Sequence, residues 1–145
     1  MKLALKIQSF IRHIMAEIEI KVPFNLSINI REMDDYLPSF KVKMIHESKG
    51  NNFKFNNEIE FWIECKEWDV FLYQLNKKEK DIELIDMNNI TRFKFQSIDK
   101  DYLITINSSI RTMGINNMIN IYEYKSEDEI FEQIIDGFKK FPKWW

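Results

Sequence analysis

The sequence predicts an α+β fold, in which a mostly antiparallel β-sheet carries two main helices and, at the amino terminus, a short third one. Along most of the chain apolar residues alternate with polar ones, which is the period of a strand with one buried face. Two segments instead repeat apolar residues at helical spacing, and turn-forming sequences separate the strands. Runs of strands with separate helices are typical of α+β folds, and 145 residues suit one domain spanning 1–145.

The amino-terminal residues predict a short basic amphipathic helix. Apolar side chains recur at helical spacing from Leu3 to Ile18, with Lys6 and Arg12 on the other side, although residues 3–7 would also fit a strand. Such a helix could lie on a membrane surface, but covering the domain's own core is the commoner use. Polar residues interrupt the opening apolar run before it reaches signal-sequence length, and no apolar run reaches about 18 residues. We therefore expect a cytoplasmic protein that does not bind membranes.

The next segments predict strands. Every even position from Ala16 to Ile30 is apolar, and Pro23 should divide this segment into two strand pieces joined by a bend, or confine it to a sheet edge. Residues 32–39 predict a loop. Residues 40–46 and 53–63 alternate again on either side of a turn-forming sequence, and this pattern predicts a hairpin.

The centre of the chain changes its period without an intervening Gly or Pro. Alternation continues to Cys65, after which Trp68, Phe71, Leu72 and Leu75 fall along one side of a helix. This helix should fold back over the apolar face of the sheet, with Phe71 and Leu72 in the core. Further strands are predicted at 82–85, 91–98, 102–110 and 118–124.

The carboxyl-terminal segment predicts the second main helix. Ser126 and Glu129 have the spacing of a capping box just before an apolar run, and Pro142 should stop the helix. Gly137 is unfavourable inside a helix by about 1 kcal/mol, so it is expected to mark a close crossing against the sheet. The final residues, Trp144 and Trp145, could pack on Val70 and Tyr73 of the central helix.

The charge balance and the single cysteine limit the classes of function. A formal net charge of −2 argues against a nucleic-acid-binding surface built from excess basic residues. Cys65 is the only cysteine, so no intrachain disulfide can form, and a reducing compartment suits the chain.

No motif for catalysis, metal binding or cofactor binding is present. The only histidines, His13 and His46, could form a nucleophilic pair with Cys65 only if the fold brought them together. Cys65 falls on the buried phase of its strand, where cysteine usually behaves as a small apolar residue. No closely spaced His or Cys ligands occur, the three glycines are far apart, and carboxylates alternating along a strand are normally its wet face. We expect a protein that is not an enzyme and uses no cofactor.

The exposed phase of the central strand is the main candidate for partner binding. Trp62 shares it with Glu58, Glu60 and Glu64, and an aromatic anchor among carboxylates would suit a basic protein partner. The alternative is that the amino-terminal helix covers Trp62. A second acidic and aromatic cluster lies on the predicted loop, where a plain solvated loop is the alternative. The predicted partner-binding residues are Glu58, Glu60, Trp62, Glu64, Glu67, Asp69, Asp34, Asp35 and Tyr36.

Three parts of the sequence carry a resemblance: the central stretch from Trp68 to Leu75, the strands from Ile82 to Tyr124, and the segment from Ser126 to Pro142. Together they resemble bacterial toxin-immunity proteins, the WapI-like and related contact-dependent growth inhibition families. The resemblance covers roughly residues 40 to 142. It implies a cytoplasmic protein without catalytic residues that binds one cognate toxin domain, often a nuclease, and blocks it. The alternative is a small-ligand-binding domain with a pocket between the aromatic-rich sheet and its helices. The oligomeric state stays open.

Overall fold

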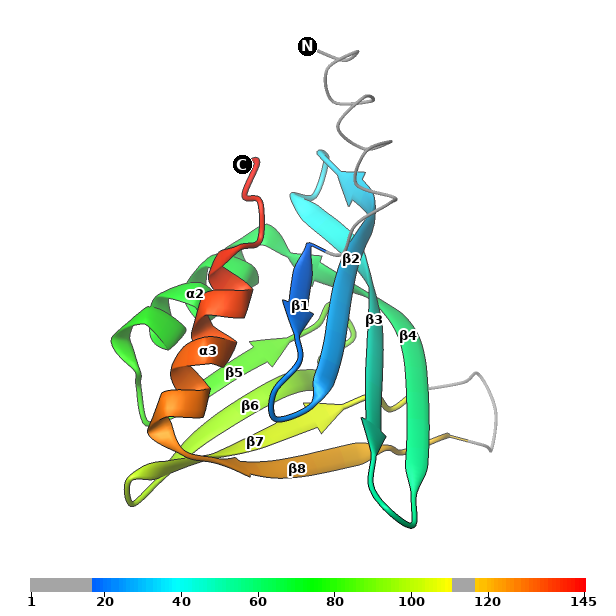
Figure 1. Ribbon diagram of the computed structural model, residues 1–145. Coiled ribbons are helices and arrows are strands. Elements are labelled where there is room, and N and C mark those ends of the chain that lie inside the picture. Colours follow the sequence, from blue (N-terminus) through cyan, green and yellow to red (C-terminus); the bar gives the residue numbers. More distant parts are fainter. Residues whose placement is uncertain (1–16, 111–116) are drawn as a thin grey trace.

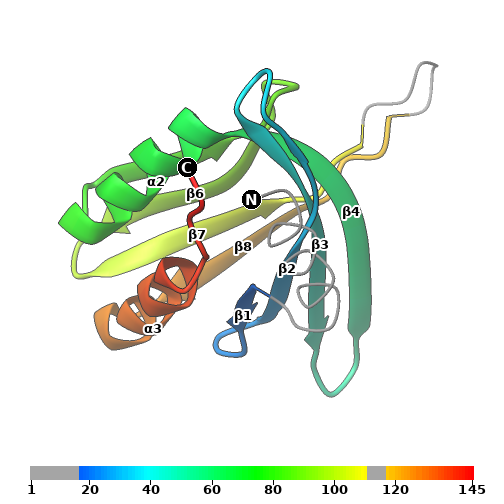
Figure 2. The same cartoon turned by 90° about the horizontal axis from the view of Figure 1, so that it is seen from above.

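The described residues form two antiparallel four-stranded sheets and two helices, which confirms the predicted α+β class. The computed structural model describes residues 17–110 and 117–145. The predicted amino-terminal helix lies in residues outside this range, apart from its last positions. The strands of the two sheets run in different directions, and the helices α2 and α3 lie on the same side of the second sheet (Figures 1 and 2).

The first sheet has the strand order β1-β2-β3-β4 and is a meander, in which each strand pairs antiparallel with the next one in sequence. Pro23 lies in the turn after the first strand, so the predicted division into two strand pieces is confirmed. The predicted loop at 32–39 is wrong in part, because a bulge after Ile30 lets the second strand continue to Asp34. Only a short turn then remains. The bounds are β1 Ile18–Ile20, β2 Asn25–Asp34, β3 Ser39–Lys49 and β4 Lys54–Glu64.

The second sheet is a meander of β5 Asp81–Ile85, β6 Thr91–Ile98, β7 Asp101–Asn107 and β8 Ile121–Ser126. These four strands were predicted. The last two differ at their ends, because beyond Asn107 the described residues pair through single contacts, the Ser108 N–H bond to the Asn120 carbonyl and an isolated bridge between Ile110 and Met118.

Helix α2, Cys65–Lys77, begins directly after β4 and covers β5. The Phe71 ring packs on Phe93 and Phe95 of β6, so α2 lies mainly on the second sheet and not on the sheet of its own preceding strand. Phe71 is buried and Leu72 only half-buried. Cys65 is the first residue of this helix and not, as predicted, the last of the strand.

Helix α3, Asp128–Lys139, covers β1. The predicted capping box is absent: Ser126 still belongs to β8, and Glu127 occupies the N-cap position without a side-chain capping bond. The predicted close crossing at Gly137 is confirmed, because a Cβ there would lie 2.9 Å from Ile20 Cγ1 of β1.

The last two tryptophans pack elsewhere than predicted. Both rings contact Phe40 of β3, at centroid distances of 5.4 Å for Trp144 and 5.5 Å for Trp145. Val70 and Tyr73 stay 52% and 59% exposed. The tail therefore closes the core between β3 and α2 and leaves the outer side of α2 free.

Aromatic side chains fill the space between the helices and the second sheet. The Phe138 ring lies 5.2 Å from Phe71 and 5.4 Å from Phe93, and Tyr102 stacks on Phe131 at 3.8 Å. This is where the alternative of a small-ligand pocket placed its cavity. Buried rings occupy that space in the described part of the chain.

Polar side chains join the two sheets at the far ends of β3 and β4. The ring of His46 is fully buried, and its Nε2 lies 2.9 Å from the Tyr124 hydroxyl of β8. Beside it, the Asn57 side-chain amide donates to Ser108 and to the Tyr122 hydroxyl. These bonds anchor the lower half of β4 to the second sheet.

Candidate functional site

The outer face of β4 carries the predicted acidic and aromatic residues together. Glu58, Glu60, Trp62 and Glu64 occupy alternate positions of the strand and so share one face, while the intervening residues belong to the core or to the sheet junction. Glu58 and Glu60 are exposed, and Trp62 and Glu64 are half-buried. The predicted common face is therefore confirmed, although Trp62 is less exposed than expected.

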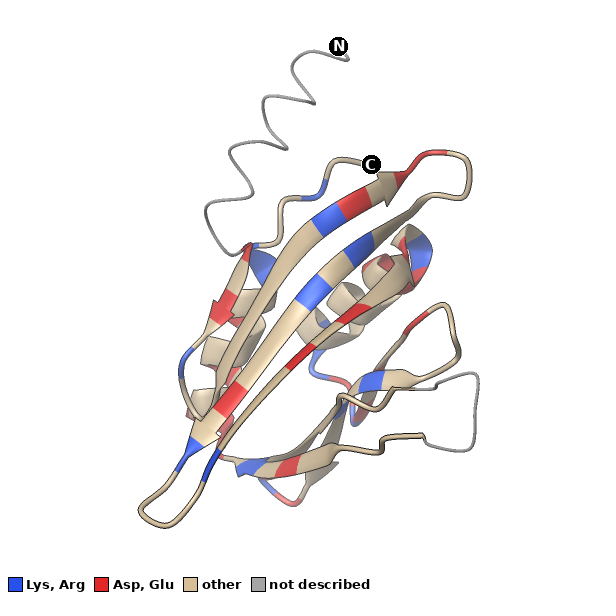
Figure 3. Ribbon diagram, turned by 90° about the vertical axis from the view of Figure 1, so that its right-hand side faces the viewer, with Lys and Arg blue, Asp and Glu red and all other residues tan. Residues whose placement is uncertain are grey.

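Lysines of β3 lie between these carboxylates. Lys41 is directly opposite Trp62, and Lys43 is opposite Glu60. Lys41 Nζ lies 3.3 Å from Glu60 and 3.5 Å from Glu32, and Lys43 pairs with Glu58. The hydrogen bond to Glu60, and then the charge of Glu32, raise the pKa of Lys41. Figure 3 shows this mixed pattern, with basic residues on the middle strand and acidic residues beside them. The sequence predicted Trp62 among three carboxylates, and the register of β3 against β4 adds lysines to that face.

The outer edge of β4 is more strongly acidic than its face. The backbone N–H of Met87, in the turn before β6, donates to the Trp62 carbonyl oxygen at 2.9 Å, so this turn runs along the edge of β4 that faces away from β3. Pockets flank the bond on both sides. One, of about 320 Å³, is lined among others by Glu58, Glu60, Asn88, Ile90, Arg92 and Ser109. The other, of about 150 Å³, is lined by Glu64, Glu67, Ile85, Asp86, Met87 and Asn89.

We call these two pockets together the β4 groove. Four of the predicted partner-binding residues, Glu58, Glu60, Glu64 and Glu67, line it, and no lysine is among the described residues that do. Lys41 and Lys43 lie on the sheet face beside the groove. Glu58 and Glu60 pair with these two lysines and Glu64 pairs with Lys66, so the described lining of the groove is acidic and the matching basic side chains lie outside it.

A buried ion pair shapes the far wall of the groove. Arg92 Nε donates to Asp86 Oδ2 at 2.8 Å, and both side chains are almost fully buried. The other Asp86 oxygen accepts the backbone N–H groups of Asn88 and Ile90, at 2.8 and 3.0 Å. Arg92 also donates to the carbonyl oxygens of Asn107 and Ser109, which ties the turn to the end of β7. The groove is therefore bounded by a rigid wall.

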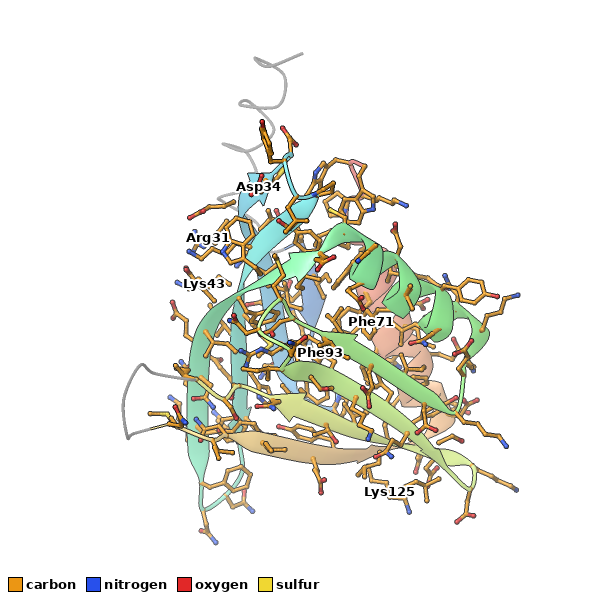
Figure 4. All side chains as sticks on the ribbon, turned by 180° about the vertical axis from the view of Figure 1, so that it is seen from behind. Arg31, Asp34, Lys43, Phe71, Phe93 and Lys125 are labelled. Atoms are coloured by element: carbon orange, nitrogen blue, oxygen red, sulfur yellow. The ribbon has the colours of Figure 1, made fainter. Side chains whose placement is uncertain are left out.

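The remaining predicted residues divide into two groups. Asp34 lies opposite Ser39, which lies opposite Glu64, so the β2–β3 hairpin tip and the upper end of the groove are at the same end of the sheet. Asp34 accepts the Tyr36 N–H and Tyr36 is fully exposed; Figure 4 labels Asp34 at this tip. Asp69 does not line the groove. Its carboxylate accepts a hydrogen bond from Trp145 Nε1–H and pairs with Lys143 in the carboxyl-terminal tail.

The Cys–His pair considered from the sequence does not form between Cys65 and His46. Cys65 follows Glu64, which pairs with Ser39, whereas His46 lies seven residues further along β3, roughly 23 Å away at strand spacing. Burial lowers the pKa of His46 to about 4, and burial followed by the charge of Asp69 raises the pKa of the Cys65 thiol. Neither group is prepared for nucleophilic chemistry.

Within residues 17–110 and 117–145, no group of three or more His, Cys, Asp or Glu side chains is arranged to hold a metal ion. None of the helices in this part of the chain is long and apolar enough to span a membrane.

Sequence reasoning missed the far wall of the groove. Asp86, Met87, Asn88 and Asn89 were predicted only as a turn, and Arg92 only as part of a strand. An Asp that opens a turn commonly bonds the backbone N–H two residues later, so the turn itself was readable. That this turn lies beside β4 was not.

No family model, curated protein or solved structure matches the chain. Function is therefore inferred from the site and from the residues that carry the resemblance described above.

Proposed function

We propose that this chain is an immunity protein that binds a cognate bacterial toxin domain in the cytoplasm and neutralises it. The observation that carries this proposal is the β4 groove, where four of the predicted carboxylates line the two pockets on either side of the Met87 bond to the half-buried Trp62. A concave acidic surface next to an aromatic side chain suits a basic protein partner, because charge steers the encounter and the aromatic ring anchors it. A nuclease domain, whose substrate groove is basic, fits this description.

The chain acts by binding and not by catalysis in this proposal. The buried thiol of Cys65 and the neutral, buried ring of His46 have structural roles in the core and at the sheet junction. Replacing Cys65 or His46 by Ala should leave protection against the toxin intact wherever the fold survives. Loss of protection with unchanged stability in either variant would instead favour an enzyme.

The test is neutralisation of a toxin in cells. We expect the gene to follow a reading frame for a large secreted protein, whose carboxyl-terminal domain should arrest growth when expressed alone. Co-expression of this chain should restore growth, and Trp62→Ala should reduce the protection. Glu123→Lys is the matched control, because Glu123 is exposed on β8, away from the groove. Growth arrest that persists despite well-folded chain would contradict the proposal.

A further inference from the structure

The β4 groove exposes backbone hydrogen-bonding groups as well as carboxylates. In an antiparallel pair, residues alternate between those that bond to the partner strand and those whose N–H and C=O groups point away from it. The Trp62 carbonyl bonds to Met87 and not to β3, so Trp62 belongs to the second class. The register between β3 and β4 is continuous, so Glu60 and Glu58 belong to it too.

The backbone groups of Glu58 and Glu60 therefore point into the larger pocket. Among the described residues, no side chain or backbone group outside the sheet bonds to them. This open segment of β4 ends at Trp62, which bonds to Met87, and at Asn57, whose side chain bonds to Ser108 and Tyr122. It is a short length of open sheet edge at the bottom of a groove.

An extended polypeptide is the ligand that satisfies such an edge, because its own N–H and C=O groups continue the ladder. The charge of the groove selects the kind of segment. Among the described residues that line its two pockets, five carry carboxylates and one, Arg92, is basic. Arg92 is buried against Asp86, which leaves the carboxylates of Glu58, Glu60, Glu64 and Glu67. A segment with Lys or Arg at alternate positions would place its cations beside Glu58 and Glu60.

The same charges disfavour a second copy of this chain as the occupant. Two β4 edges paired with each other would bring Glu58 and Glu60 of both copies together, and like charges on neighbouring strands are destabilising. A basic segment of a different protein has no such penalty.

We propose that the edge of β4 at Glu58 and Glu60 receives an extended basic segment of the partner as an added strand. The inference rests on the proposed function for the identity of that partner, but not for the chemistry of the edge. Binding by strand addition predicts that the amides of Glu58 and Glu60 are unprotected in the free protein and become protected in the complex.

The first experiment uses the full chain and a capped peptide that alternates lysine with valine. Amide hydrogen exchange followed by NMR should show protection of Glu58 and Glu60 when this peptide is added, by at least about tenfold. The counterpart that alternates glutamate with valine should bind at least tenfold more weakly. Unprotected Glu58 and Glu60 amides at millimolar lysine peptide would overturn the proposal.

The second experiment replaces the outward N–H. Glu58→Pro removes no donor from the β3–β4 ladder, so this edge position can accept Pro, but it should lower peptide affinity at least tenfold. Glu58→Ala is the matched control: it removes the carboxylate and keeps the N–H, so it should lose less. If Glu58→Pro and Glu58→Ala bound the peptide with equal affinity, strand addition would be contradicted. A wild-type dimer that Glu58→Pro converts to monomer would also contradict the proposal, because the occupant of the edge would then be a second copy of this chain.

The two proposals can fail separately. If Glu58→Pro still protects cells from the toxin while Trp62→Ala does not, the toxin docks on the sheet face, and strand addition is wrong but immunity stands. If the lysine peptide protects the Glu58 and Glu60 amides and no toxin is neutralised, the edge site stands and the immunity function is wrong.

Discussion

The covered and open sheet edges of this molecule are built differently. α3 covers β1, and Gly137 lets the helix backbone approach Ile20. α2 covers β5, with Phe71 packed on the sheet behind it. Along the edge of β4, by contrast, the neighbouring turn makes a single backbone bond and leaves an acidic groove.

The open edge of β4 is the place where this fold can accept another strand. Exposed strand edges invite pairing with other chains, and proteins usually cover them or place charges on them. Of the four edge strands, β1 and β5 contact helices through small and aromatic residues, while carboxylates keep the edge of β4 soluble. The open edge is thus protected against copies of itself and still available to a basic strand.

The largest expected effect tests the covered side of α2. Phe71→Ala should lower the free energy of unfolding by about 3 to 5 kcal/mol, because it leaves a cavity among buried rings. Val70→Ala, one residue away on the exposed side, should cost well under about 1 kcal/mol. Urea denaturation measures both, and equal losses would refute this assignment of the two faces.

The junction at the lower end of β4 should make stability depend on pH. His46 has its pKa lowered to about 4 by burial, from a usual 6.5, so the unfolded chain binds a proton first as pH falls. Stability should be complete above about pH 6.5, lower by about 2 kcal/mol at pH 5, and lower by about 3 kcal/mol at pH 4. Urea midpoints between pH 7 and 5 measure this loss.

A variant separates the buried histidine from other titrating groups. His46→Gln should be less stable at pH 7 but should lose most of the pH dependence between 6.5 and 5. An unchanged slope would show that His46 is not the group responsible.

Substitutions at the open edge of β4 should reduce affinity for the toxin domain. Trp62→Ala should weaken affinity for the toxin domain by about 2 kcal/mol or more, as expected of a central aromatic anchor. Its effect on unfolding should be smaller than that of Phe71→Ala, because Trp62 is half-buried. Calorimetric titration decides this, and wild-type affinity would move the interface, first to the Asp34 to Tyr36 hairpin tip.

Adding one methyl group to α3 where it contacts β1 should lower the stability of the protein. In Gly137→Ala the new Cβ would lie 2.9 Å from Ile20 Cγ1, and such overpacking costs about 1 to 3 kcal/mol. Better helix propensity offsets about 1 kcal/mol of this, so a net loss near 1 kcal/mol is expected. Asp136→Ala, at the exposed neighbouring position, is the control. A stabilised Gly137→Ala would mean that α3 does not press on β1.

The smallest expected effect concerns the charges of the groove. Glu60→Lys combined with Glu64→Lys should mainly slow association with the toxin, and the slowing should shrink at high salt because screening weakens long-range attraction. The fold should lose about 1 kcal/mol or less, since the pairs that are broken, Lys41 with Glu60 and Lys66 with Glu64, are partly exposed to solvent. Stopped-flow mixing at two salt concentrations measures the rate. An equal slowing by Glu123→Lys would show that net charge, and not the groove, is responsible.

The local elements could be predicted from the sequence because each depends on residues a few positions apart. Alternation identified the hairpin of β3 and β4, helical spacing placed Phe71 inside and Val70 outside, and the helical position of Gly137 indicated a close crossing. The common face of Glu58, Glu60, Trp62 and Glu64 follows from the same short-range periodicity.

Which distant segments meet depends on contacts that span the whole fold. Lys41 lies opposite Trp62 through strand register, Met87 reaches Trp62 across two sheets, and Trp145 packs on Phe40 instead of Val70. A register shift of one residue would reverse every side chain of a strand, and nothing within a short window specifies it. The acidic residues of β4 were therefore readable from the sequence, whereas the groove beside them arises from contacts between residues far apart in the chain.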